Sequence, residues 1–253
     1  MDKREDQLHQ VVRVAELAAR LMLGNGGETY RAEETAQHIC RAFGYESDAI
    51  AFPTGLMLSV GGEKSVISRV PRRQVDFMKI DRVNAISREL SAGTLALDEA
   101  EGMLRALSSA DGAHSIKRGL IAGGSSAMFA VMFGGSAFDL VAAGAGAFVT
   151  QAVVSRLSED AGPTLVSLVG GFLAAIMALV ITSVFAIGDV NRIILSALMP
   201  LLPGLAMTNA IRDAMRGDLV SGVAGAGEAL IRAVVLAAGA GLAISAWMMG
   251  GGA

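Results

Sequence analysis

Long uncharged apolar stretches in the second part of the chain constrain its fold more than any other feature. Residues 119–253 carry 5 Lys and Arg and 7 Asp and Glu, whereas residues 1–118 carry 16 and 17. A helix needs about 20 apolar residues to cross the hydrocarbon core of a bilayer. The sequence therefore predicts a soluble domain at residues 1–115, followed by a membrane domain at residues 116–253.

The membrane domain is expected to be all-α, with five transmembrane helices. We place them at Gly119–Phe138, Asp139–Ser155, Thr164–Ile187, Val190–Asn209 and Ala229–Met249. Lys and Arg favour the cytoplasmic side of a membrane. If the soluble domain is cytoplasmic, Arg192 is the one basic residue near the span ends that falls outside. In this topology the soluble domain is cytoplasmic and the C-terminus lies on the external side of the membrane.

The soluble domain is predicted to be α+β. Apolar residues recur at helical spacing over residues 6–23 and 28–43, which predicts two amphipathic helices. Two further helices are expected around Val83–Leu90 and Ala100–Leu107. Between the pairs we expect short strands at Ala49–Phe52, Gly55–Val60 and Ser65–Val70, with a hairpin turn at Gly61-Gly62-Glu63.

A broken apolar helix within residues 199–222 is the best pointer to a transport pathway. Proline removes a backbone donor, and the carbonyls it frees must be satisfied by protein or by a water-lined cavity. The alternative is an ordinary proline-kinked helix with a charged cytoplasmic end. The residues that we assign to the pathway or to substrate binding are Pro200, Pro203, Gly204, Asn209, Arg212 and Asp218.

Individual charges near the spans allow two interpretations each. Asp139 is either a solvated turn residue or a site of proton or cation coupling. Arg212 and Arg216 either bind a substrate carboxylate or act as topology-setting positive charges beside lipid headgroups. Asp213 and Asp218 are then possible partners of these arginines, and Asp189 is a possible partner of Arg192.

Several functional classes are disfavoured by the sequence. A net charge of −3 gives no basic excess for nucleic-acid binding. His38 and Cys40 are too few ligands for a structural zinc site, so we expect no metal and no cofactor. No nucleophile–His–acid arrangement or Gly-x-Ser-x-Gly motif is visible, which argues against an enzyme, and a membrane-anchored hydrolase ranks last.

The chain resembles the threonine/serine exporter family over nearly its whole length. The segments that carry the resemblance are GNGGETYRAEETAQHICRAFG (Gly24–Gly44), FPTGLMLSV (Phe52–Val60), RVNAISRELSAG (Arg82–Gly93) and the PLLPG…N..RD...GD..SG pattern at Pro200–Gly222. The resemblance is to the N-terminal half of full-length members, which continue with a second five-span half. It is similar to the long subunit of a split bacterial arrangement, in which a short, wholly membrane-embedded subunit completes the transporter. One such pair is linked to succinate export.

The resemblance implies a subunit of a bacterial inner-membrane exporter of small carboxylate metabolites, either threonine and serine or a succinate-like dicarboxylate. We expect a proton gradient as the driving force, and as partners the lipid bilayer and either the short subunit or further copies of this chain. The rival hypothesis is a non-transporting scaffold or regulatory subunit whose cytoplasmic domain binds a partner. That domain is expected either to gate the pathway or to recruit the second subunit.

Overall fold

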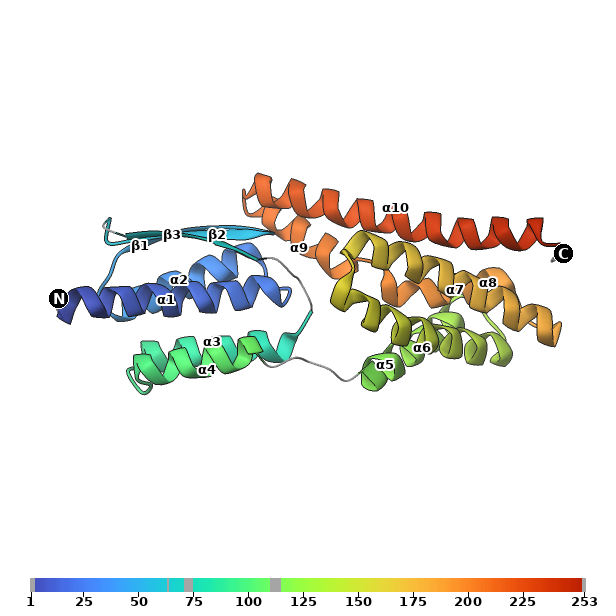
Figure 1. Ribbon diagram of the computed structural model, residues 1–253, viewed down its shortest axis with the longest axis horizontal. Helices are drawn as coiled ribbons and strands as arrows, with labels where there is room; N and C mark the ends of the chain where they lie inside the picture. Colours follow the sequence, from blue (N-terminus) through green and yellow to red (C-terminus); the bar gives the residue numbers. More distant parts are fainter. Residues whose placement is uncertain (1–2, 63, 71–74, 110–114, 252–253) are drawn as a thin grey trace. The chain divides into compact units, whose positions relative to one another are not determined.

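The computed structural model describes residues 3–62, 64–70, 75–109 and 115–251, which are mainly helical with one small sheet (Figure 1). The chain divides into two compact units. Unit 1 consists of Met1–Asp111 with Leu205–Gly227, and unit 2 consists of Gly112–Gly204 with Glu228–Ala253. The boundary predicted at 115/116 adjoins residues 110–114, which lie outside the described residues, and it stays a prediction. The sequence did not indicate that 205–227 joins the N-terminal part.

Helices α1 (Lys3–Gly24) and α2 (Thr29–Ala42) form the centre of unit 1, and they confirm the two predicted amphipathic helices. Their apolar faces are fully buried, with Val11, Ala15 and Met22 on α1 and Ile39 on α2. In Figure 1 the sheet lies along one side of these helices, and α3 and α4 lie along the other. The two helices therefore supply most of the core of unit 1.

The sheet is a three-stranded antiparallel meander of β1 (Ser47–Phe52), β2 (Gly55–Val60) and β3 (Lys64–Arg69), in the order β1-β2-β3. Leu56, Leu58 and Val60 alternate inward and are buried, as a half-covered sheet requires. Gly61 and Gly62 have φ values of +64° and +69°, which suit the tight hairpin turn predicted there. The third residue assigned to that turn, Glu63, lies outside the described residues.

Two more helices complete the N-terminal part of unit 1: α3 (Phe77–Ser91) and α4 (Leu97–Ser109). The Asp76 side chain accepts a hydrogen bond of 3.1 Å from the backbone N–H of Lys79 and so caps α3. Val83 and Leu104 point into the same core as α1 and α2. The predicted α+β composition of this part of the chain is thereby confirmed.

Unit 2 contains helices with small residues inside and larger apolar residues outside. They are α5 (Ser115–Met132), α6 (Ala137–Asp160), α7 (Pro163–Phe185), α8 (Val190–Leu198), the 3₁₀ turn η1 (Met199–Leu201) and the part of α10 (Leu219–Met249) that follows Gly227. Its core includes Ala143, Ala175, Ala178 and Ala243, while Phe172 and Val184 are exposed. This distribution is typical of helices packed within a bilayer.

Three helices among the described residues are long and apolar enough to cross a membrane: Ala137–Ser158, Pro163–Phe185 and Leu219–Met249. A fourth is counted if the bent pair Val190–Leu201 and Gly204–Met215 forms one span. The expected number of five is therefore not confirmed. The first predicted span corresponds to α5, which includes Lys117 and Arg118 among its 18 residues and ends at Met132.

The helix break predicted at the prolines is present. Pro200 lies in η1, Pro203 follows that turn, and Gly204 begins α9 (Gly204–Met215). Leu202 has an extended backbone with ψ of 139°, because the ring of a following proline disfavours the helical conformation. The break therefore follows directly from the Leu-Pro-Gly sequence.

Candidate functional site

The connection between α1 and α2 is a glycine loop that accepts contacts from a distant part of the chain. Gly26 has a φ of +87°, a conformation that favours glycine. A Cβ on Gly27 would lie 2.8 Å from the carbonyl oxygen of Met22, so a side chain does not fit there. The two glycines shape the loop so that the Gly26 carbonyl, Glu28 and Thr29 are available to α9 and to the turn that follows it.

Two side chains of α9 reach this loop. The Asn209 amide Nδ2 donates to the Gly26 carbonyl at 3.0 Å. The Arg212 guanidinium donates to Glu28 Oε1 at 2.7 Å, and Arg31 lies 3.5 Å from the other oxygen of the same carboxylate. The Glu28 side chain is 10% exposed, whereas that of Arg212 is 56% exposed. The arginine is thus anchored at one end of its guanidinium and accessible elsewhere.

Asp218 connects the turn between α9 and α10 to the same loop. One carboxylate oxygen accepts from the Ser221 backbone N–H at 3.2 Å, which caps the start of α10, and the other accepts from the Thr29 hydroxyl at 3.3 Å. The Ser221 hydroxyl in turn donates to the Ala51 carbonyl at 3.0 Å. Asp218 therefore has a structural role as well as its predicted place in the site.

Asp213 is buried at the centre of these contacts, with 4% of its surface exposed. It lies against Thr29 and close to the carboxylates of Glu28 and Asp218. Its Oδ1 is one of the buried side-chain atoms that have no hydrogen-bond partner among the described residues. We call Glu28, Thr29, Arg212, Asp213 and Asp218 the acid–arginine cluster.

Glu33 on α2 borders the acid–arginine cluster. Burial raises the pKa of the Glu33 carboxyl, and the nearby charges of Asp218 and Asp213 act in the same direction. The backbone N–H of Ala51 opposes the shift by donating to Glu33 Oε1 at 2.7 Å. The protonated form of the Glu33 carboxyl is therefore favoured beside the cluster.

A cation–π contact lies beside the cluster. The Arg216 guanidinium is 3.5 Å from the centre of the Tyr30 ring, so the turn that follows α9 also contacts the first turn of α2. Neither Arg212 nor Arg216 forms an ion pair with Asp213 or Asp218 in the part of the chain that the structure describes. Instead of pairing with these aspartates, Arg212 pairs with Glu28 of the α1–α2 loop and Arg216 contacts Tyr30 of α2.

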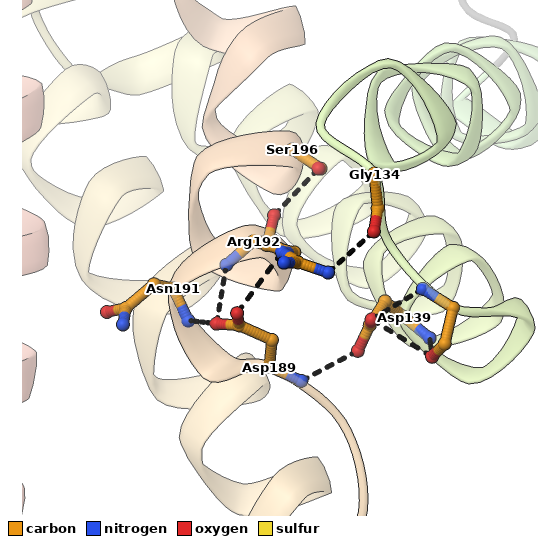
Figure 2. Close-up of polar contacts among 7 residues, drawn as sticks. Gly134, Asp139, Asp189, Asn191, Arg192 and Ser196 are labelled. Atoms are coloured by element: carbon orange, nitrogen blue, oxygen red, sulfur yellow. Dashed lines mark hydrogen bonds and ion pairs between the residues drawn. The ribbon is translucent and has the colours of Figure 1, made fainter.

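A second polar group, which we call the cap cluster, consists of Ser136, Asp139, Asp189 and Arg192 in unit 2 (Figure 2). Asp139 Oδ2 accepts from the Ser136 N–H at 2.7 Å and from its hydroxyl at 2.9 Å, forming a capping box at the start of α6. Asp139 Oδ1 accepts from the Asp189 N–H at 2.8 Å. Both carboxylate oxygens therefore stabilise turns.

Asp189 and Arg192 form the ion pair expected from the sequence, with 3.2 Å between Arg192 Nε and Asp189 Oδ2. The Arg192 guanidinium also donates to the Gly134 carbonyl at 2.5 Å (Figure 2). Gly188, which precedes this turn, has a φ of +99°, and a Cβ there would lie 2.7 Å from Asp139 Oδ1. The cap cluster thus joins the α5–α6 and α7–α8 turns.

The predicted site residues divide between the two units. Asn209, Arg212 and Asp218 come together in unit 1, while Pro200, Pro203, Gly204 and Asp139 belong to unit 2. Glu28, Thr29 and Asp213 were not predicted as site residues. Residues 24–44 and residues 199–222, which contain these three residues, had each been singled out in the sequence. Nothing in the sequence showed that these two segments contact each other.

The described residues contain no group of three or more His, Cys, Asp and Glu side chains that could hold a metal ion. His38 is exposed and Cys40 is fully buried in the core of unit 1.

Comparisons with known proteins point to transport. A family model described as "Putative threonine/serine exporter" matches residues 13–247. The chain is 27% identical over 254 residues to a "Threonine/serine exporter" of Corynebacterium glutamicum, covering 93% of this chain and 51% of the relative. It is 23% identical over 241 residues to a "Probable threonine/serine exporter" of Mycobacterium tuberculosis, covering 89% and 44%. The chain thus spans about half the length of these curated relatives, and no solved structure matches it.

Proposed function

The chain belongs to the threonine/serine exporter family, and from that membership we propose that it is a subunit of a secondary-active exporter of small carboxylate metabolites. Its substrates are threonine and serine or a succinate-like dicarboxylate, and a proton gradient drives their export. The observation that carries the proposal is the family match over residues 13–247, together with three to four apolar helices of membrane-spanning length.

The accessible guanidinium of Arg212 is the proposed contact for the substrate carboxylate. Arginine has five N–H donors, and the contact with Glu28 uses one nitrogen of the group. Asn209 and Asp218 hold the neighbouring loop and turn in place. Pro200, Pro203 and Gly204 maintain the helix break, which we propose lies on the transport pathway.

We propose an inner-membrane location with the N-terminal part in the cytoplasm and the C-terminus outside. This orientation follows the positive-inside rule and requires that α5 also cross the membrane, making five spans. The domain division at 115/116 is part of this proposal. A fluorescent or protease-accessible tag at each terminus tests it, because two tags on the same side would contradict an odd number of spans.

A second membrane-embedded half is the proposed partner. The curated relatives are about twice as long as the matched region, and we propose that a separate short subunit or another copy of the chain supplies an equivalent second half. The alternative function is that of a scaffold or regulatory subunit. Unit 1 has its own buried core, which suits the binding of a partner as well as gating.

Efflux from proteoliposomes tests the proposal. Vesicles containing the purified chain, alone and together with a short membrane subunit, are loaded with labelled threonine or succinate and placed in a proton gradient. Gradient-dependent efflux in either arrangement is the expected result. Absence of chain-dependent flux in both arrangements, with folded protein in the vesicles, would support the scaffold instead.

Asp139 is the coupling candidate that the sequence suggested, and it stays a proposal. Its contacts are those of a helix cap, which account for its burial without any role in coupling. The same efflux assay, combined with a measurement of thermal stability, distinguishes the two roles.

A further inference from the structure

The buried carboxylate of Asp213 has an oxygen that nothing in the described structure satisfies. The residue is 4% exposed, and Oδ1 is buried without a hydrogen-bond partner among the residues that the structure describes. Removing an ionised carboxylate from water without a compensating donor costs free energy, and the group avoids this cost by taking up a proton. The position therefore suits a residue that is neutral during part of a working cycle.

Thr29 lies within hydrogen-bonding reach of Asp213, and the charged groups that act on Asp213 are acidic. The nearby acids are Glu28 in the α1–α2 loop, Glu33 on α2 and Asp218 in the α9–α10 turn. The charges of Glu28 and Asp218 act on Asp213, and the charge of Asp213 acts on Glu33. Three arginines of these elements have other contacts: Arg212 and Arg31 pair with Glu28, and Arg216 lies over Tyr30. Neighbouring negative charges disfavour a further ionised carboxylate.

A proton is the ligand that fits this site. No group of three or more metal-ligating side chains is present among the described residues, so the site lacks the oxygen cage that a divalent cation requires. A proton needs only the free oxygen of one carboxylate. Its binding converts the ionised Asp213 to the neutral acid, and its release to water restores the negative charge.

We propose that Asp213 is a proton-binding residue of this exporter, with Oδ1 as the atom that takes up a coupling proton. This assignment rests on the proposed function and names a residue, distinct from Asp139, that links transport to the gradient. Protonation relieves repulsion between Asp213 and the carboxylates of Asp218 and Glu28. Because Thr29 contacts both aspartates, a change in the charge of Asp213 acts directly on the junction between the α1–α2 loop and α9.

Infrared difference spectroscopy tests proton binding without relying on transport. The purified full-length chain is titrated across neutral pH, and the carbonyl stretch of protonated carboxylic acids is recorded. We expect a titrating band in the wild type that is absent from Asp213→Asn and present in Glu34→Gln, which removes an exposed carboxyl from α2. A band that persists unchanged in folded Asp213→Asn would overturn the proposal.

A conservative variant covers the case in which Asp213→Asn does not fold. Asp213→Glu retains a carboxyl at the same position, so we expect its band to shift in frequency or in titration midpoint. A band that is identical in the wild type and in folded Asp213→Glu would assign the proton to another residue and overturn the proposal.

Flux measurements separate this inference from the proposed function. In folded Asp213→Asn we expect gradient-driven efflux to fall at least about tenfold, while exchange of labelled for unlabelled substrate in the absence of a gradient persists. Efflux by Asp213→Asn that still responds fully to the gradient would refute the coupling role alone. If the wild type gives no flux with or without the second subunit, the proposed function fails, and the coupling role fails with it. The infrared band would then report only a protonated buried acid.

Discussion

Arg212 on α9 donates to the carboxylate of Glu28, the residue that precedes α2, across 2.7 Å and 184 positions of sequence. Arg31 approaches the second oxygen of Glu28 at 3.5 Å. A carboxylate that is 10% exposed is therefore shared by two arginines, of which one belongs to a segment that follows the proline break. This contact joins 205–227 to the N-terminal part of the chain within unit 1.

The ion pair between Arg212 and Glu28 should contribute more to the free energy of unfolding than a fully exposed pair does, although the Arg212 side chain itself is half exposed. We expect Glu28→Gln to destabilise the protein by roughly 1 kcal/mol, because it weakens both arginine contacts. A double-mutant cycle with Arg212→Ala, read from thermal unfolding in detergent, should give a coupling free energy of about 0.5–1 kcal/mol.

The pair Arg105–Glu101 is the matched control for this cycle. It has a similar separation of 2.6 Å and a similarly buried carboxylate, with the Glu101 side chain 14% exposed and approached at 3.6 Å by Arg13, but Arg105 and Glu101 belong to one helix. A coupling free energy of about 0.3–0.5 kcal/mol is typical of a pair four residues apart on a helix. Equal coupling for the two pairs would show that the Glu28 contact adds nothing beyond a pair within one helix.

Glu33 should make stability depend on pH. Burial raises the pKa of this carboxyl above its ordinary value of 4.5. An acid whose pKa is raised on folding stabilises the folded state while it is protonated, and the contribution is lost as the pH rises through the folded-state pKa. We therefore expect the wild type to lose stability relative to Glu33→Gln as the pH rises above 4.5.

Melting temperatures of the wild type, Glu33→Gln and the exposed-site control Glu34→Gln, measured from pH 4.5 upward, test this dependence. Glutamine retains an oxygen that accepts from the Ala51 N–H, so the variant changes the charge more than the contact. Parallel curves for the wild type and Glu33→Gln would contradict the prediction.

Local features of this fold were predictable because neighbouring residues determine them. Helical spacing identified α1 and α2, glycines marked the hairpin turn, and Pro203 marked the helix break. The contact between Arg212 and Glu28 was not predictable, because pairing over 184 positions leaves no periodic signal in one sequence. For the same reason the burial of Asp213 beside the α1–α2 loop could not be predicted.

The five spans expected from the sequence exceed the three or four that length and composition identify among the described residues, and the difference has a physical reason. Composition alone placed a span at Gly119–Phe138, but α5 ends at Met132 and is followed by a turn with Gly134 at a φ of +70°. Phe138 lies instead in α6, one residue before Asp139 of its capping box. Because the capping box of Ser136 and Asp139 starts a new helix within the apolar run, the preceding helix α5 is shorter than composition alone suggests.

The contact between α7 and α10 should tolerate no side chain at Gly239. A Cβ there would lie 2.1 Å from the carbonyl oxygen of Leu168, which belongs to the backbone and cannot rotate away. We expect Gly239→Ala to cost at least about 1–3 kcal/mol through overpacking. The melting temperature of the protein in detergent measures this cost.

Gly241 provides the control on the same helix. Nothing lies within 4 Å of a Cβ at this position. Gly241→Ala should be neutral or stabilising by up to about 1 kcal/mol, since alanine has the higher helix propensity. If both variants behaved alike, the close approach of α7 and α10 would be contradicted.

Asp139 should act as a helix cap. Asp139→Ala removes the acceptors for Ser136 and for the Asp189 N–H, and we expect a loss of about 1–2 kcal/mol in unfolding free energy. Asp139→Asn retains one oxygen acceptor and should be less destabilising. Thermal unfolding followed by efflux assays on equal amounts of folded protein separates the two roles. Full stability of Asp139→Asn with loss of gradient dependence would favour coupling over capping.

The most direct test of the central claim is efflux of labelled substrate by Arg212→Ala, compared with Arg105→Ala at equal amounts of folded protein. Reconstitution uses whichever arrangement, chain alone or chain with the short subunit, gives wild-type flux. Loss of a charged hydrogen bond to the substrate predicts that efflux by Arg212→Ala falls about tenfold or more, while Arg105→Ala remains at the wild-type level. Undiminished efflux by Arg212→Ala would contradict a substrate-binding role for the Arg212 guanidinium.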